Sequence, residues 1–156
     1  MKLVRLTNYS GEGCSIYSIL EDGVPRFQKF LQEITGCGFE KELININGRL
    51  ISIGKYGATE GFFKPEEWKD DEKICCLSDI PSSKLRIFCI RFESERIIVL
   101  GGGGAKPKDI RAWQEDPKLS REAKFIIMIS GILRKKIDQG DITEHGTRLN
   151  GNLNIP

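Results

Sequence analysis

The side chains best suited to chemistry gather in a basic segment near the middle of the chain. Residues 84–111 carry seven lysines and arginines against three acidic residues, although the whole chain has a net charge of only +2. Arginine suits phosphate because its planar guanidinium binds two oxygens at once and stays charged. Arg86 lies in an apolar run whose side chains alternate between two faces, and it shares its face with Lys84. Arg91 falls on the opposite face, so Arg86 and Lys84 are the better candidates for binding an anion.

Arg86 also has an interpretation that requires no ligand. A structural ion pair with an acid on a neighbouring strand, such as Asp79 or Glu95, would account for the same charge. Both interpretations of Arg86 stay open at this point. For Arg91 and Arg96 we favour simple exposure at the ends of strands.

Four consecutive glycines, residues 101–104, follow the next apolar run and lead into the basic letters KPK. Glycine leaves the backbone uncovered, so a ligand can approach it closely. The N–H groups of Gly102 and Gly103, beside Lys106 and Lys108, could then bind phosphate. The segment lacks the Gly-Lys-Ser/Thr ending of a nucleotide-binding loop. The other interpretation is a flexible joint between a strand and the following helix.

The composition indicates one folded domain rather than a membrane, metal or disulfide protein. The chain has 156 residues, of which 39% are hydrophobic and 29% charged. No apolar run approaches the roughly 20 residues of a membrane span, and the first residues do not form a signal peptide. Five cysteines without a C-x-x-C unit, and a single histidine, argue against disulfides and a metal site. We therefore expect a cytoplasmic protein with reduced thiols, no metal and no cofactor.

The hydrophobic patterns predict an α+β fold. We expect helices where apolar residues recur every three or four positions, and strands where short apolar runs are bounded by turn-forming residues. The predicted strands are 2–7, 14–20, 73–80, 84–92 and 96–102, and the predicted helices are 21–38, 39–54 and 116–140. The last three strands are joined by short links and should form an antiparallel meander, with the helices packed beside it. We expect residues 1–140 to form a single domain and residues 141–156 a flexible polar tail.

Residues 39–54 fit two structures. The apolar positions 39, 43, 46, 50 and 53 form a helical stripe. The letters NING contain the Asn-Gly signal of a hairpin turn. We predict the helix, ending at Gly54, because the stripe runs through the whole segment.

Several of these segments resemble HigB-like members of the RelE/ParE toxin superfamily. Gly23 and Pro25 lead into a helix with the pair Phe30-Leu31, like the Gly-x-x-Pro element and Phe-Leu pair of those toxins. A second amphipathic helix and a meander follow, with a Leu-Arg-Ile-type strand at residues 85–87 and a strand that ends in glycine and basic residues. The resemblance covers roughly residues 14–110 and rests on short motifs.

The resemblance implies a RelE-like fold, with a C-terminal helix beyond the usual end, and a metal-independent endoribonuclease that cuts messenger RNA. Such toxins act in the cytoplasm, usually on the ribosome, and are silenced by an antitoxin protein. The positions that match imply catalytic roles for Arg86, Lys106 and Lys108. Lys84 and Arg91, with the glycine backbone, would bind substrate. The alternative is a non-catalytic relative that binds nucleic acid or a protein partner through the same basic face.

Cleavage of RNA without a metal also needs a base for the ribose 2′-hydroxyl and an acid for the leaving oxygen. His145, in the predicted tail, is a weak candidate for either role. Tyr56 and Trp113 could stack a base, but such residues more often serve in packing or lie on the surface.

Overall fold

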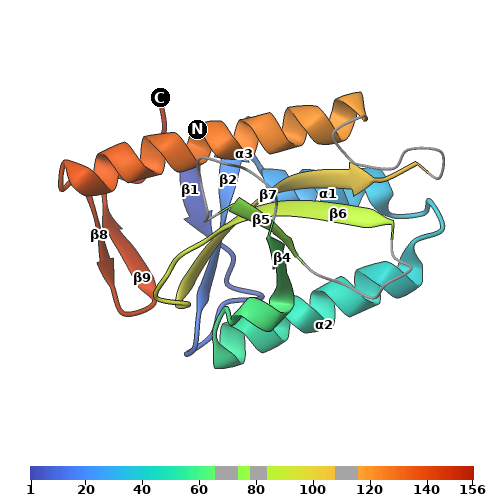
Figure 1. Ribbon diagram of the computed structural model, residues 1–156, viewed down its shortest axis with the longest axis horizontal. Helices are drawn as coiled ribbons and strands as arrows, with labels where there is room; N and C mark the ends of the chain where they lie inside the picture. The colour runs from blue at the N-terminus through green and yellow to red at the C-terminus, as the bar shows by residue number, and fades with distance from the viewer. Residues whose placement is uncertain (66–73, 78–83, 108–115) are drawn as a thin grey trace.

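The computed structural model describes residues 1–65, 74–77, 84–107 and 116–156 (Figure 1). In this part of the chain a mixed sheet has the strand order β1-β2-β7-β6-β5-β4, with β3 beside β2. The strands of the sheet are β1 Lys2–Arg5, β2 Ser15–Glu21, β3 Val24–Pro25, β4 Phe63–Pro65, β5 Ile74–Leu77, β6 Leu85–Arg91 and β7 Ile97–Ala105. The helices are α1 Arg26–Ile34, α2 Glu40–Tyr56, the 3-10 turn η1 Glu60–Phe62, and α3 Pro117–Asp138. A separate hairpin consists of β8 Ile142–His145 and β9 Arg148–Gly151.

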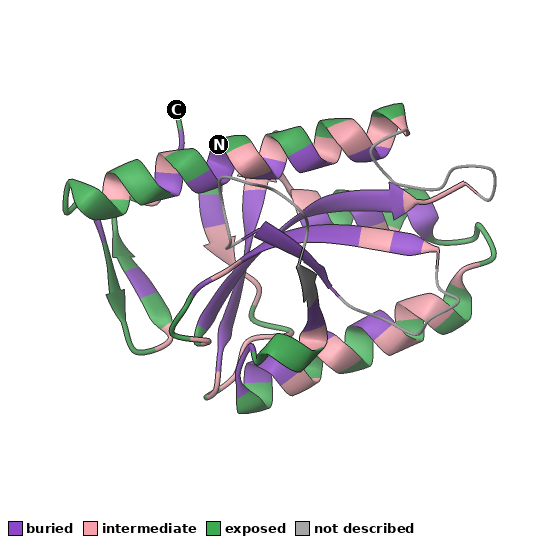
Figure 2. Ribbon diagram, viewed as in Figure 1, coloured by how far each residue is buried: buried purple, intermediate pink, exposed green. Residues whose placement is uncertain are grey.

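Helices cover both faces of the sheet (Figure 1). One core lies between the sheet and the helices α1 and α2, and includes Phe27, Leu50 and Ile87. The other lies between the sheet and α3, and includes Phe88 and Ile126. Figure 2 shows the central strands almost wholly buried, while the outer sides of α2 and α3 are exposed.

The predicted mixture of three helices with a mostly antiparallel sheet is confirmed, and the meander β5-β6-β7 pairs as expected. The parallel pairing of β2 with β7 joins the N-terminal strands β1 and β2 to this meander.

Residues 40–56 form a helix, and the hairpin alternative is wrong. Ile46, Leu50 and Ile53 from the predicted stripe are buried. The helix does not end at Gly54 as predicted, but continues to Tyr56. Gly54 packs directly against the carbonyl oxygen of Tyr9, and a Cβ at this position would overlap that oxygen. Gly54 therefore lets a loop approach the helix rather than ending it.

The long helix α3 begins as its sequence predicts. Asp116 is the N-cap, and its carboxylate accepts a hydrogen bond of 2.9 Å from the backbone N–H of Leu119. Pro117 occupies the first helical position, where its missing N–H costs nothing. Lys135 and Lys136 lie in the last turn, where cations interact favourably with the helix dipole.

Residues 141–156 form a hairpin and a packed end, not the expected flexible tail. Ile142, Leu149 and Ile155 are buried against the core beneath α3. The N–H of Leu149 donates to the hydroxyl of Tyr17 at 3.0 Å. The N–H of Ile155 donates to the carbonyl of Met1 at 2.8 Å and so holds the C-terminal end against the N-terminus. Each strand contributes a single buried side chain, so the sequence carries no alternating pattern to reveal it.

None of the helices in the described ranges is both long enough and apolar enough to cross a membrane.

Candidate functional site

The glycine run lies inside a strand. Gly101–Gly104 are buried residues of β7, which extends to Ala105. A Cβ at Gly103 would overlap the carbonyl oxygen of Arg86, and a Cβ at Gly102 would overlap the carboxylate of Glu122. The corresponding atom at Gly101 would lie 3.1 Å from the Cδ1 of Ile126. The absence of side chains therefore allows β7 to pass close to α3 on one side and to β6 on the other.

Two interpretations of these glycines are corrected by this packing. They are not a flexible joint, because they pair with β6 across an irregularity between Ile87 and Cys89. Gly102 and Gly103 were expected to offer their backbone to a substrate. Both are buried beneath α3 and against β6, so the structure does not support that contact.

Three of the predicted basic residues meet at one end of the sheet. Arg86 is paired with Gly104 in the β6–β7 ladder, and the N–H of Lys106 donates to the carbonyl of Lys84 at 2.7 Å. Opposed residues of antiparallel strands point to the same face, so all three side chains are on the face that carries α3. We call Lys84, Arg86 and Lys106 the cationic cluster. Each is half-buried, and the Nη1 of Arg86 donates to the carbonyl of Leu85 at 2.9 Å.

Arg91 does not belong to the cationic cluster. Its Nε donates to the carbonyl of Ala58 at 2.7 Å, and its Nη2 lies 3.7 Å from the carboxylate of Glu95. The guanidinium also lies over the ring of Phe63, 5.8 Å from its centroid. Arg91 thus ties β6 to the segment after α2, a structural role at the other end of the strand. Lys108 lies outside the described residues.

The carboxylate of Glu42 holds the backbone at the start of β6 in place. The Oε1 of Glu42, on α2, accepts hydrogen bonds from the N–H groups of Lys84 at 2.7 Å and Leu85 at 3.2 Å. Glu95, one of the suggested partners of Arg86, lies 3.7 Å from Arg91, whose place is at the other end of β6. Asp79, the other suggested partner, is outside the described part of the chain. Glu42 therefore fixes the start of β6, which positions two of the three cations.

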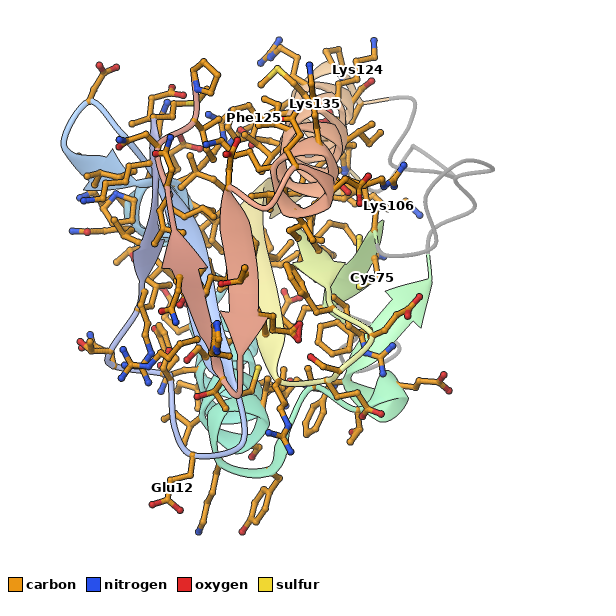
Figure 3. The ribbon with its side chains drawn as sticks, turned by 90° about the vertical axis from the view of Figure 1, so that its left-hand side faces the viewer. Glu12, Cys75, Lys106, Lys124, Phe125 and Lys135 are labelled. Atoms are coloured by element: carbon orange, nitrogen blue, oxygen red, sulfur yellow. The ribbon has the colours of Figure 1, made fainter. Side chains whose placement is uncertain are left out.

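A second basic surface runs along the outside of α3, and the sequence interpretation missed it. Arg121, Lys124, Met128 and Lys135 are exposed at spacings of three, four and seven residues, which place them on one stripe of the helix. We call these four residues the α3 stripe. Figure 3 shows Lys124 and Lys135 on the side of α3 away from the sheet. The nearby acid Glu122 faces inward and pairs with Arg26 at 3.0 Å, so it does not neutralise the stripe. A helical-wheel projection of residues 117–138 would have shown the α3 stripe in the sequence.

Two side chains suggested for chemistry from the sequence, His145 and Tyr56, lie away from the cationic cluster. His145 is on β8, in the hairpin at the opposite end of the sheet from the start of β6 (Figure 1). Tyr56 is exposed at the last residue of α2, also remote from the cluster. Trp113 is not among the described residues. The arrangement can bind a phosphate, and the carboxylate that contacts its backbone, Glu42, already accepts the N–H groups of Lys84 and Leu85.

Burial shifts the pKa of two other groups. Burial raises the pKa of the Cys14 thiol to about 12, and it also raises the pKa of the half-buried Tyr9 phenol. Both groups are therefore neutral at neutral pH. Cys14 belongs to the core beneath α1 and α2, and Tyr9 packs edge-on against Phe27 with ring centroids 5.9 Å apart. These shifts reflect packing and not catalysis.

Two hollows adjoin Tyr9 and are separate from the cationic cluster. One, of about 410 Å³, lies between the end of β1 and α1, and the other, of about 290 Å³, lies between α1 and α2. Both are lined by Tyr9, Phe27 and Leu31. The rim of the second includes Ile44, which is 72% exposed.

The chain was compared with protein-family models, with curated proteins and with solved structures, and none of them matches it.

Proposed function

We propose that the protein binds RNA through the cationic cluster and the adjacent α3 stripe, and that it does so without cleaving the RNA. The observation that carries the proposal is the meeting of Lys84, Arg86 and Lys106 on one face at the end of β6 and β7. Residues 14–110 resemble HigB-like toxins, and this makes RNA the preferred polyanion. The protein would then be a binding relative of those ribonucleases, acting in the cytoplasm.

The cationic cluster and the start of α3 lie on the same side of the sheet. Lys84 and Lys106 are adjacent across the ladder, with Arg86 one step further along β6. Arg121 and Lys124 lie on the first two turns of α3, the helix that covers the same face of the sheet. A single-stranded backbone could therefore contact the cluster first and continue along the helix. Lysine and arginine contacts to phosphate supply affinity without sequence preference.

Binding without cleavage follows from which groups accompany the cations. A metal-free reaction needs a base, an acid and a cation at one phosphate. The cationic cluster is defined by lysine and arginine, and His145 lies in the hairpin at the other end of the sheet. Cations hold the phosphate and stabilise charge. The Oε1 of Glu42, the carboxylate at the start of β6, is already hydrogen-bonded to the N–H groups of Lys84 and Leu85, so we infer binding without an efficient base for the 2′-hydroxyl proton.

The test compares two double variants that lose the same charge. Lys84→Gln with Lys106→Gln removes two members of the cationic cluster. Lys29→Gln with Lys55→Gln removes two exposed lysines of α1 and α2, on the other face of the sheet. Fluorescence anisotropy with a labelled single-stranded RNA should show at least about tenfold weaker binding for the first variant, since each exposed phosphate contact contributes about 1 kcal/mol. The second should bind like the wild type.

Equal binding by both double variants would contradict the proposed interface. Gel analysis of the same RNA should show no cleavage products. Products that disappear with Arg86→Ala, together with growth arrest when the wild type is induced, would instead assign toxin activity. In that case an antitoxin partner would be expected.

A further inference from the structure

Two thiols face each other across adjacent strands of the sheet. Cys75 of β5 and Cys89 of β6 are direct partners in the antiparallel ladder. Their Sγ atoms lie 3.5 Å apart, and the Sγ of Cys89 is 3.3 Å from the carbonyl oxygen of Cys75. Both residues belong to the core beneath α1 and α2. The pairing of the two strands therefore holds the sulfurs in contact.

The backbone at this position is compatible with a disulfide. Directly opposed residues of antiparallel strands have Cα atoms about 4.5–5.5 Å apart, within the roughly 4.4–6.8 Å found for disulfides. An S–S bond is about 2.0 Å long, so sulfurs that start 3.5 Å apart must approach by about 1.5 Å. Small rotations of the two side chains supply this movement, and the strands need not separate.

We propose that Cys75 and Cys89 are a redox-active pair that forms a reversible disulfide when the protein meets a peroxide. Cys75 is 5% exposed and Cys89 is fully buried, so Cys75 reacts first. Its sulfur attacks one oxygen of the peroxide, the O–O bond breaks, and hydrogen peroxide yields Cys75 sulfenic acid and one water. The sulfur of Cys89 then attacks that of Cys75. The S–O bond breaks, and the departing hydroxide takes the Cys89 proton as a second water.

Neighbouring cysteines make the pairing specific. Cys76 follows Cys75 directly, but its cross-strand partner is Phe88 and its side chain lies in the core beneath α3. Cys76 thus points to the opposite face of the sheet from Cys89. Cys37 is exposed after α1, where it can only form links between molecules or react as a single thiol. A dithiol reaction should therefore select Cys75 over Cys76 although the two are adjacent.

The experiment uses the full chain with Cys37→Ser to prevent links between molecules. The folded protein is treated with a small excess of hydrogen peroxide and blocked with iodoacetamide. It is then digested with trypsin without reductant. We expect residues 74–84 to be linked to residues 87–91, with two of the four remaining thiols lost and both recovered with dithiothreitol. Because residues 74–84 contain Cys75 and Cys76, the variants Cys75→Ala and Cys76→Ala identify the reacting thiol.

The link should survive in Cys76→Ala and disappear in Cys75→Ala. Circular dichroism shows that each variant is folded, and any variant that is not is replaced by the corresponding serine substitution. A link that persists in Cys75→Ala would overturn the assignment. So would the absence of a link in folded Cys76→Ala, or a link that forms only after unfolding in urea.

Discussion

Replacing Gly103 by alanine adds one methyl group at the most crowded point of β7. In the structure this group would overlap the carbonyl oxygen of Arg86 on β6, and the Cα of Ile87 would be 3.0 Å away. Both are backbone atoms of the neighbouring strand. Neither can rotate away as a side chain does, so relief requires β6 and β7 to separate locally.

The cost can be bounded from this geometry. Adding a methyl group to a packed core costs about 1–3 kcal/mol, and more where backbone must move. We expect Gly103→Ala to lower the free energy of unfolding by about 3 kcal/mol or more. For a chain of this size that corresponds to a fall in melting temperature of about 6–12 °C.

Urea unfolding followed by circular dichroism measures the change, with Gly131→Ala as the matched control. Gly131 lies in the middle of α3, where an added Cβ would meet no atom within 4 Å. The control should gain about 0.5–1 kcal/mol, because glycine is a poor helix former. If the free energy of unfolding of Gly103→Ala stays within about 0.5 kcal/mol of the wild-type value, then close approach of β6 does not require glycine at this position.

Three further predictions concern stability. Glu42→Ala should lower the free energy of unfolding in urea by about 1–3 kcal/mol, because the N–H groups of Lys84 and Leu85 lose their acceptor. An unchanged urea midpoint would contradict this role of Glu42. Asp116→Ala should lower the free energy of unfolding by about 1 kcal/mol, because α3 loses its N-cap. Asp116→Asn should keep most of the wild-type stability, since its amide oxygen can also accept from the N–H of Leu119. Burial raises the pKa of Cys14 from 9.0 to about 12. Between these two pH values the folded chain keeps the thiol proton and the unfolded chain loses it. The free energy of unfolding should therefore fall by up to about 4 kcal/mol as the pH rises from 9 to 12. Cys14→Ala should make the curve from pH 8 to pH 11 flatter; an equally steep curve would show that Cys14 does not contribute.

The helices could be predicted because each carries a local signal. In α3 the cap Asp116, the following proline and the closing lysines mark both ends. In α2 the buried stripe outweighs the Asn-Gly turn signal, because burial of Ile46, Leu50 and Ile53 in the core stabilises the helix along its length. The meander was likewise visible as apolar runs with short links.

The glycine run could not be interpreted correctly from sequence. Glycine is depleted in strands because it offers no side chain to pack, so four in succession predict a loop. Here the close approach of α3 and β6 makes small size more important than strand propensity, since a Cβ at Gly102 or Gly103 has no room. That approach is a long-range property that no local pattern encodes.

The candidate site was predictable in part. Alternation along β6 placed Lys84 and Arg86 on one face and Arg91 on the other, as the structure confirms. The pairing that brings Lys106 beside Lys84 depends on β7 continuing through the glycines, so it was hidden. The hairpin of residues 142–151 was missed because each strand buries only one residue.

The salt dependence of RNA binding reports directly on whether Lys84 and Lys106 contact phosphate groups. Each phosphate contact on single-stranded nucleic acid contributes about 0.7 to the slope of log K against log salt concentration. Loss of Lys84 and Lys106 should therefore make the slope shallower by about 1.4, while the charge-matched Lys29 and Lys55 variant should keep the wild-type slope. A cluster variant with the wild-type slope and affinity would contradict the claim that these lysines contact RNA.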